Sequence, residues 1–195
     1  MVVRTPALTR RLAAVVFALA AHAASAVAAD SDSFMLDARC RDGRPQGSYR
    51  LRDASGQLRV AGAFDEGVRT SSFLFWRANG VRVAQVPYDD NGHVNGTLAT
   101  WFDADPGREP TMRFESEVRG GVRQGETRSW YADGRPRTRA DYDGGRIVAV
   151  EAWDERGRPL DGDAARALAA RDARDADAEA VQRDALIRDH MPGCD

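Results

Sequence analysis

Between about residue 44 and residue 160, short runs of alternating apolar and polar residues are separated by glycine-containing turn pairs. Alternation with a period of two predicts β-strands with one buried face. Pairs such as Asn79-Gly80 and Asp133-Gly134 supply the two positive-φ positions of a type I′ hairpin turn. Since turn pairs stand at both ends of the second strand of each hairpin, the chain is predicted to form a meander of up to about ten strands, each about five to seven residues long.

The alternating runs repeat, with successive units starting 24, 25, 29 and 24 residues apart. The 29-residue unit carries a longer turn that contains Pro106. Four of the five units place one tryptophan just before the outer turn: Trp76, Trp101, Trp130 and Trp153. One aromatic residue per fixed period is typical of a repeat array. Residues 30–160 are therefore predicted to be mainly β, an elongated antiparallel meander of about five tandem β-hairpin repeats.

Residues 161–195 have a different texture, rich in Ala, Arg and Asp, with no proline before Pro192. High alanine content favours a C-terminal α-helix, for which Asp161 or Asp163 is the expected N-cap. The apolar content is thin. We therefore expect the middle of this helix, residues 171–179, to be solvated or partly frayed.

The two cysteines, Cys40 and Cys194, lie near opposite ends of the chain. Ten strands about 4.8 Å apart span about 43 Å, and a helix of about 28 residues is about 42 Å long. The helix is therefore expected to run back across the sheet and bring Cys194 to Cys40. A disulfide is the leading interpretation for an exported chain, and two unpaired thiols are the alternative.

The first 29 residues resemble a secretory signal peptide. Arg4, Arg10 and Arg11 precede an apolar run of about ten residues, and small residues follow at positions 26–29. A transmembrane helix needs about 20 apolar residues, so stable membrane insertion is not expected. An N-terminal anchor that stays in place is the alternative. A periplasmic or secreted bacterial protein is the predicted localisation.

Charge and motif content narrow the function classes. After residue 29 the chain has 25 arginines, no lysine and 30 acidic residues, a net charge of −5. This balance argues against nucleic-acid binding, which needs a positive surface. His93 and His190 show no metal-ligand spacing with the cysteines, and neither stands in a nucleophile–base pattern. No phosphate- or dinucleotide-binding motif is present in the sequence. We predict no catalytic, metal or cofactor site.

One motif recurs along the repeat: Gly125, Trp130-Tyr131, Asp133-Gly134, Tyr142 and Gly145-Arg146, echoed by Phe75-Trp76, Asn79-Gly80, Tyr88 and Gly92. With this motif the repeat resembles the bacterial MORN-repeat-variant family, often described as YwqK-type antitoxin proteins. The likeness covers about residues 43–160. It departs from the pattern at Leu51-Arg52, which replace the aromatic pair in the first unit, and at the Pro106 insertion. The resemblance implies an elongated single-sheet array of β-hairpins and, through the family name, neutralisation of a toxin.

Two roles are open for the aromatic stripe. It either packs under the helix or against neighbouring aromatic side chains, or part of it forms an exposed platform for a partner or a glycan. The candidate partner-binding residues are Trp76, Trp101, Trp130, Tyr131 and Trp153. The predicted function is that of an exported, non-catalytic protein-binding repeat protein, in the manner of an immunity or antitoxin-like factor that occludes a protein partner. The alternative is a cell-envelope structural or assembly factor that binds peptidoglycan, another glycan or a membrane surface.

Overall fold

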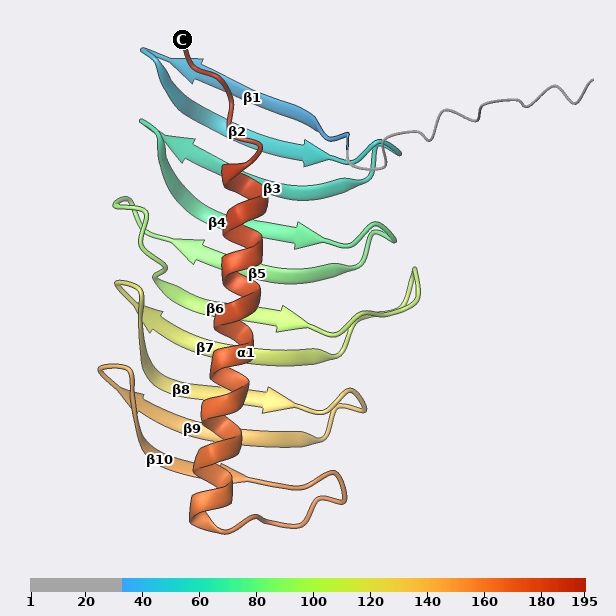
Figure 1. The fold of residues 1–195 in the computed structure, drawn as a ribbon, viewed down its shortest axis with the longest axis vertical. Coiled ribbons are helices and arrows are strands. Elements are labelled where there is room, and N and C mark those ends of the chain that lie inside the picture. The colour runs from blue at the N-terminus through green and yellow to red at the C-terminus, as the bar shows by residue number, and fades with distance from the viewer. Residues whose placement is uncertain (1–32) are drawn as a thin grey trace, which may run out of the picture. The chain divides into compact units, whose positions relative to one another are not determined.

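In the computed structural model, which describes residues 33–195, ten strands form one open antiparallel sheet, and each strand pairs with its neighbours in the sequence (Figure 1). The predicted meander is confirmed. The predicted signal peptide, residues 1–29, lies outside the described residues. The strands are β1 (Met35–Arg41), β2 (Arg44–Arg52), β3 (Leu58–Asp65), β4 (Val68–Trp76), β5 (Arg82–Tyr88), β6 (Gly96–Trp101), β7 (Met112–Arg119), β8 (Val122–Trp130), β9 (Pro136–Asp143) and β10 (Arg146–Ala152).

Two kinds of turn alternate along the sheet, and only one is the predicted type I′. Asp42-Gly43 and Glu66-Gly67 have positive φ at both positions, as type I′ requires. At Asn79-Gly80 only the glycine has positive φ, at 83°. The Asn79 side chain accepts the Val81 amide proton at 3.0 Å, which is an Asx turn. The type I′ prediction is therefore wrong for Asn79-Gly80, Asn91-Gly92 and Asp133-Gly134, where a three-residue loop with glycine in its last position takes its place.

The helix α1 (Gly162–Arg188) crosses one face of the sheet from β10 back to β1 (Figure 1). Its N-cap is Asp161, whose carboxylate accepts the Ala164 amide proton at 2.9 Å. The helix is continuous through residues 171–179, so the expected fraying is wrong. The acidic side chains of this stretch bind arginines of the sheet instead of water alone.

We call the side of the sheet under α1 the helix face and the opposite side the open face. Directly paired residues follow one another across the helix face, and this row changes character along the sheet. It is apolar from β2 to β5 and carries hydroxyl side chains on β6, β8 and β9. Its members are Leu51, Val60, Phe75, Ala84, Thr100, Phe114, Ser129, Thr138 and Ala152.

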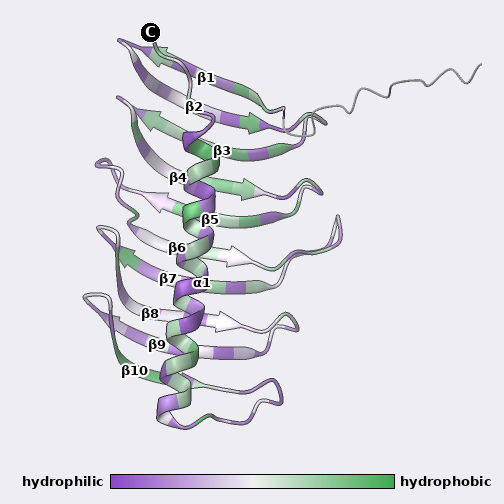
Figure 2. Ribbon diagram, in the orientation of Figure 1, coloured by the Kyte–Doolittle hydropathy of each residue, from purple (hydrophilic) through white to green (hydrophobic). Residues whose placement is uncertain are grey.

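The main hydrophobic core therefore lies under the C-terminal half of α1. Tyr49, Phe73 and Ile187 are fully buried there. Phe64 packs edge-on against Tyr49 and Phe73, with ring centroids 5.5 Å apart in each pair. Two smaller clusters near β9 and β10 include helix alanines. Figure 2 shows the contrast along every second strand: the arrowheads of β2 and β4, next to the row, are hydrophobic, whereas those of β6 and β8 are pale.

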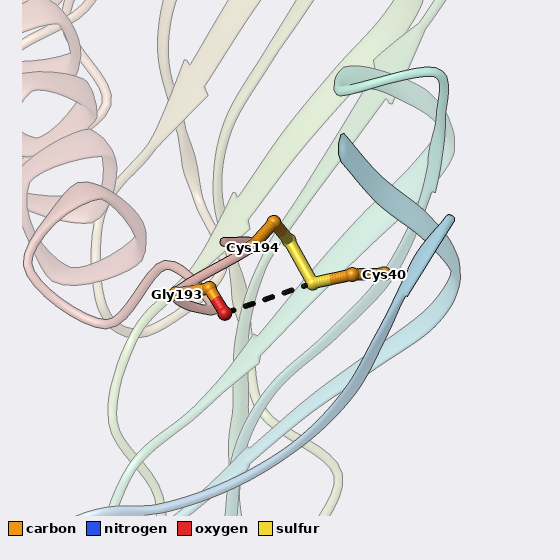
Figure 3. The surroundings of a disulfide bond; sticks show 3 residues. All are labelled: Cys40, Gly193 and Cys194. Atoms are coloured by element: carbon orange, nitrogen blue, oxygen red, sulfur yellow. Dashed lines mark hydrogen bonds between the residues drawn. A yellow bond between two sulfur atoms is a disulfide. The ribbon is translucent and has the colours of Figure 1, made fainter. Parts of the chain in front are cut away.

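A disulfide joins Cys40 in β1 to Cys194 after α1, with the two Cα atoms 5.6 Å apart (Figure 3). The pairing expected from the matched lengths of helix and sheet is present. It closes a sequence separation of 154 residues. In the chain-entropy account, closing so long a loop stabilises the folded state by up to about 5 kcal/mol. The bond fixes the end of the helix to the first strand of the sheet.

Candidate partner-binding face

The tryptophans follow helix-face residues directly in sequence. Phe75 points to the helix, so Trp76 points to the open face, because successive side chains of a strand alternate. The same step separates Thr100 from Trp101 and Ser129 from Trp130. Trp153 follows buried Ala152 just beyond β10.

The tryptophans are half-buried and do not form the core. The buried core contains none of them, and no aromatic ring pair among residues 33–195 includes one. The expectation that this stripe packs under the helix is therefore wrong. Phe73, Phe75 and Tyr49 occupy that place, because they stand at the strand positions that face α1.

Trp76 and Trp101 lie beside an arginine on the open side of the sheet. The Arg82 guanidinium lies 4.5 Å from the Trp101 ring centroid, a cation–π distance. Arg82 also pairs directly with Trp76 across β4 and β5. Trp76 and Arg82 line a surface groove with Arg108 and Glu109 of the long turn. These side chains place two indoles, two arginines and one carboxylate on one surface.

Tyr131 and Trp130 have a more structural setting. The Tyr131 hydroxyl donates to the Trp153 carbonyl at 2.8 Å, and the Arg137 guanidinium lies 5.2 Å from its ring centroid. Burial raises the pKa of the Tyr131 hydroxyl. Trp130 follows Ser129, which borders the cavity between α1 and the sheet, and its own side chain points to the open face. The structure therefore brings Trp76 and Trp101 to one binding surface and uses Tyr131 to connect the last two hairpins.

Another row of paired residues crosses the open face. It carries a charged side chain on β2, neutral side chains on β3 to β6 and charged side chains again from β7 onward. Its members, starting on β2, are Arg50, Ala61, Leu74, Gln85, Ala99, Glu115, Arg128, Arg139 and Glu151.

At the charged end of this row, both Arg128 and Arg139 bind the Glu126 carboxylate. The hydrogen bond from Arg128 is the main cause that lowers the pKa of Glu126. The open face thus has an apolar part with tryptophans and a part with fixed charge.

The helix face holds a cavity of about 260 Å³ between α1 and strands β6–β9. Ser129 donates to Asp172 at 2.6 Å and shares a 2.7 Å hydrogen bond with Thr138. Arg137 binds the same carboxylate, and Arg113 binds Glu179 on the next turns of the helix. Each of these carboxylates is already engaged by an arginine, so we assign this site to helix–sheet packing.

Sequence reasoning missed the arginines that join the sheet to the helix. Arg113 and Arg137 are the second residues of β7 and β9, and each sits in a β-bulge opposite a tryptophan position. The bulge turns a side chain that alternation assigns to the open face toward α1. The recurrence of an arginine two or three residues after an outer turn was the available sign.

The two histidines within residues 33–195 lie apart, His93 in an inner turn and His190 after the helix. The His190 ring packs against Phe34, with centroids 4.6 Å apart. Within residues 33–195, no group of three or more His, Cys, Asp or Glu residues is placed to hold a metal ion. In the same part of the chain, no helix is long and apolar enough to cross a membrane.

Comparison with known proteins gives no relative. No protein-family model matches the chain. No curated protein matches it in sequence.

Proposed function

We propose that the chain is an exported, non-catalytic repeat protein that binds a protein partner through its open face. One observation carries this proposal. The helix covers one face of the sheet, while the other face keeps Trp76 and Trp101 half-buried beside Arg82. Tryptophan and arginine are the side chains most enriched at the energetic centres of protein interfaces.

The neighbouring open-face residues fit a protein surface. Leu74 lies in the row next to the tryptophans, is half-buried and supplies apolar contact area. The paired charges of Glu126, Arg128 and Arg139 lie farther along the same face. An apolar centre with charges at one side is the usual anatomy of a specific interface, in which the charges set orientation.

Occlusion is the proposed mechanism. A sheet of ten strands held by a helix and a disulfide is already ordered before it binds, so little conformational entropy is lost on association. Such a surface blocks whatever part of the partner it covers. The resemblance to antitoxin-type repeat proteins suggests that the blocked partner is a toxin, and the disulfide fits action in an oxidising compartment.

The test compares partner recovery by three purified proteins from periplasmic extract of the native host. These are the wild type, the Trp76→Ala/Trp101→Ala double variant, and Arg156→Ala, which changes an exposed turn residue. We expect one protein to be recovered by the wild type and by Arg156→Ala, and at least about tenfold less by the double variant. Recovery that is equal with all three proteins, or no reproducible partner at all, would contradict the proposal.

A second candidate, binding of an envelope glycan, is favoured by the groove beside Trp76. An aromatic ring next to Asn79, Arg82 and Glu109 offers both a stacking surface and hydrogen-bonding groups. Sedimentation with purified peptidoglycan distinguishes the two candidates. Cosedimentation that Trp76→Ala abolishes, with the fold intact by circular dichroism, would favour the glycan role over a protein partner.

A further inference from the structure

The two edges of the sheet are finished differently. At β10, the chain turns back so that the Leu160 amide donates to the Ala152 carbonyl at 2.9 Å, and Pro159 forms a bridge with Trp153. The Arg166 side chain donates to the Ile147 carbonyl at 3.2 Å. A returning segment with proline and a charged side chain is a common way to block further strand pairing.

The edge at β1 carries no such cover within residues 33–195. No strand of this part of the chain pairs with the outer side of β1. Met35 and Leu36 are 52% and 37% exposed, which places two of the large exposed apolar side chains on this one strand. The irregularity between β1 and β2 lies in β2, where residues 47–49 stand opposite Ala38 alone, so β1 itself runs regularly.

The β1 edge is also held in place. Its Cys40 is tied to Cys194, and Phe34 just before it packs on His190 after the helix. Leu36 pairs with Leu51 of the helix face, so Leu36, Ala38 and Cys40 point to the helix side. Asp37 and Arg39 consequently point to the open face. A fixed strand offers its backbone groups to a partner strand without first becoming ordered.

We infer that β1 pairs antiparallel with β1 of a second copy of this chain. With Ala38 opposite Ala38 of the second copy, Asp37 stands opposite Arg39 of that copy, and the reverse pair forms by symmetry. Opposite charges directly across strands stabilise pairing, and like charges oppose it. Moving the centre to Arg39 places two arginines opposite each other, and moving it to Asp37 places two aspartates opposite each other. The order Asp-Ala-Arg therefore selects one symmetric register.

This pairing continues the antiparallel alternation of the sheet and keeps both helices on one side. It joins ten strands to ten and leaves the two capped β10 edges outermost, so the assembly closes as a dimer. The contact is small compared with a stable dimer interface of about 1,600 Å². We expect a reversible dimer whose dissociation is promoted by salt, because its ion pairs are exposed.

Sedimentation velocity of the purified protein from about 1 to about 300 µM tests the inference, a range suited to a weak dimer. Arg39→Asp places two carboxylates opposite each other in both cross-strand pairs and should weaken dimerisation about tenfold or more. The double variant Asp37→Arg/Arg39→Asp restores both ion pairs and should dimerise as the wild type does. Circular dichroism and thermal unfolding establish that each variant is folded.

Val148→Lys is the matched control, since it adds a charge at the other edge strand, where Val148 is 61% exposed. It should leave the dimer unchanged. A wild-type protein that stays monomeric over the whole range would overturn the inference. So would a dimer that Arg39→Asp leaves intact, a double variant that fails to recover, or association that Val148→Lys abolishes.

Discussion

The two halves of the repeat array fill the space under the helix in different ways. Under the C-terminal half of α1, strands β2–β5 supply Tyr49, Phe73 and Phe75 to an apolar core that receives Ile187. Under its N-terminal half, β7–β9 supply the hydroxyl pairs Ser116–Thr127 and Ser129–Thr138. The strands, turns and registers are nearly the same in both halves. The repeat pattern therefore determines the backbone, whereas the side chains that point to the helix can form either apolar or polar contacts.

The stability of the polar half depends on each buried polar group having a hydrogen-bond partner. Asp172, Asp177 and Glu179 receive arginines from the sheet, namely Arg137, Arg123 and Arg113. Since a buried hydrogen-bonding group without a partner is costly, this half has fewer acceptable substitutions at its paired positions. The apolar half tolerates exchange of similar volumes but not the loss of volume. Substitutions in each half test this difference.

Phe73→Ala should have the largest effect. Phe73 is fully buried and contacts Tyr49, Phe64 and Tyr88. Loss of such a ring lowers the free energy of unfolding by about 3–5 kcal/mol. Urea unfolding followed by tryptophan fluorescence measures it. Thr100→Ala, at a buried position of the same kind in the polar half, serves as comparison, and an equal loss there would show that the halves do not differ.

Removing the disulfide should have the next largest effect. Cys40→Ser/Cys194→Ser is expected to lower the free energy of unfolding by about 2–5 kcal/mol. The apolar anchor at Ile187 remains, so amide exchange should rise mainly after residue 188. Wild type under reducing conditions should behave as the variant does. Uniformly faster exchange along the whole of α1 would instead mean that the bond, and not the core, holds the helix on the sheet.

Asp172→Ala should destabilise the polar half. The Asp172 side chain is 9% exposed and accepts from Ser129 and Arg137, so its loss leaves both donors without their acceptor. We expect a decrease of about 1–3 kcal/mol in the free energy of unfolding. Asp175→Ala is the control, because Asp175 borders the same cavity from an exposed position. Equal effects of the two variants would argue against the role assigned to Asp172.

The pH dependence that Tyr49 gives to the free energy of unfolding should be the smallest of these effects. Burial raises the pKa of Tyr49 from 10.0 to about 12. The folded state keeps its proton where the unfolded state loses it, so this stability is full below pH 10 and decreases between pH 10 and about 12. Tyr49→Phe should flatten the profile in this window and, through loss of the hydrogen bond to the His190 carbonyl, lower stability by about 1 kcal/mol at neutral pH. If Tyr49→Phe leaves the decrease in stability between pH 10 and about 12 unchanged, other tyrosines cause that decrease.

Local sequence rules were sufficient for the architecture. Alternation and glycine pairs predicted the meander, and alanine content predicted the helix, with Asp161 as one of two candidate caps. The lengths of helix and sheet predicted that Cys194 meets Cys40. These features follow from local backbone preferences and from element lengths, and both can be estimated from a single sequence.

The side-chain roles were harder to predict. Four tryptophans in register suggested a core stripe, but the strand phase gave the helix side to Phe75 and its equivalents. The bulges that turn Arg113 and Arg137 toward α1 insert one residue into the register, and this shift is invisible to a simple two-residue period. The acidic middle of the helix looked solvated because its arginine partners lie 35 to 66 residues away.

Because the disulfide joins the first strand to the residues after α1, the length of the helix must match the width of the sheet. One more hairpin would widen the sheet by about 9.6 Å, which corresponds to about six or seven further helical residues at about 1.5 Å each. A chain that gained or lost a unit without this compensation would have a tail that no longer reaches its cysteine. We therefore expect the number of hairpins and the length of α1 to change together, whereas a loop insertion such as the one that contains Pro106 changes neither.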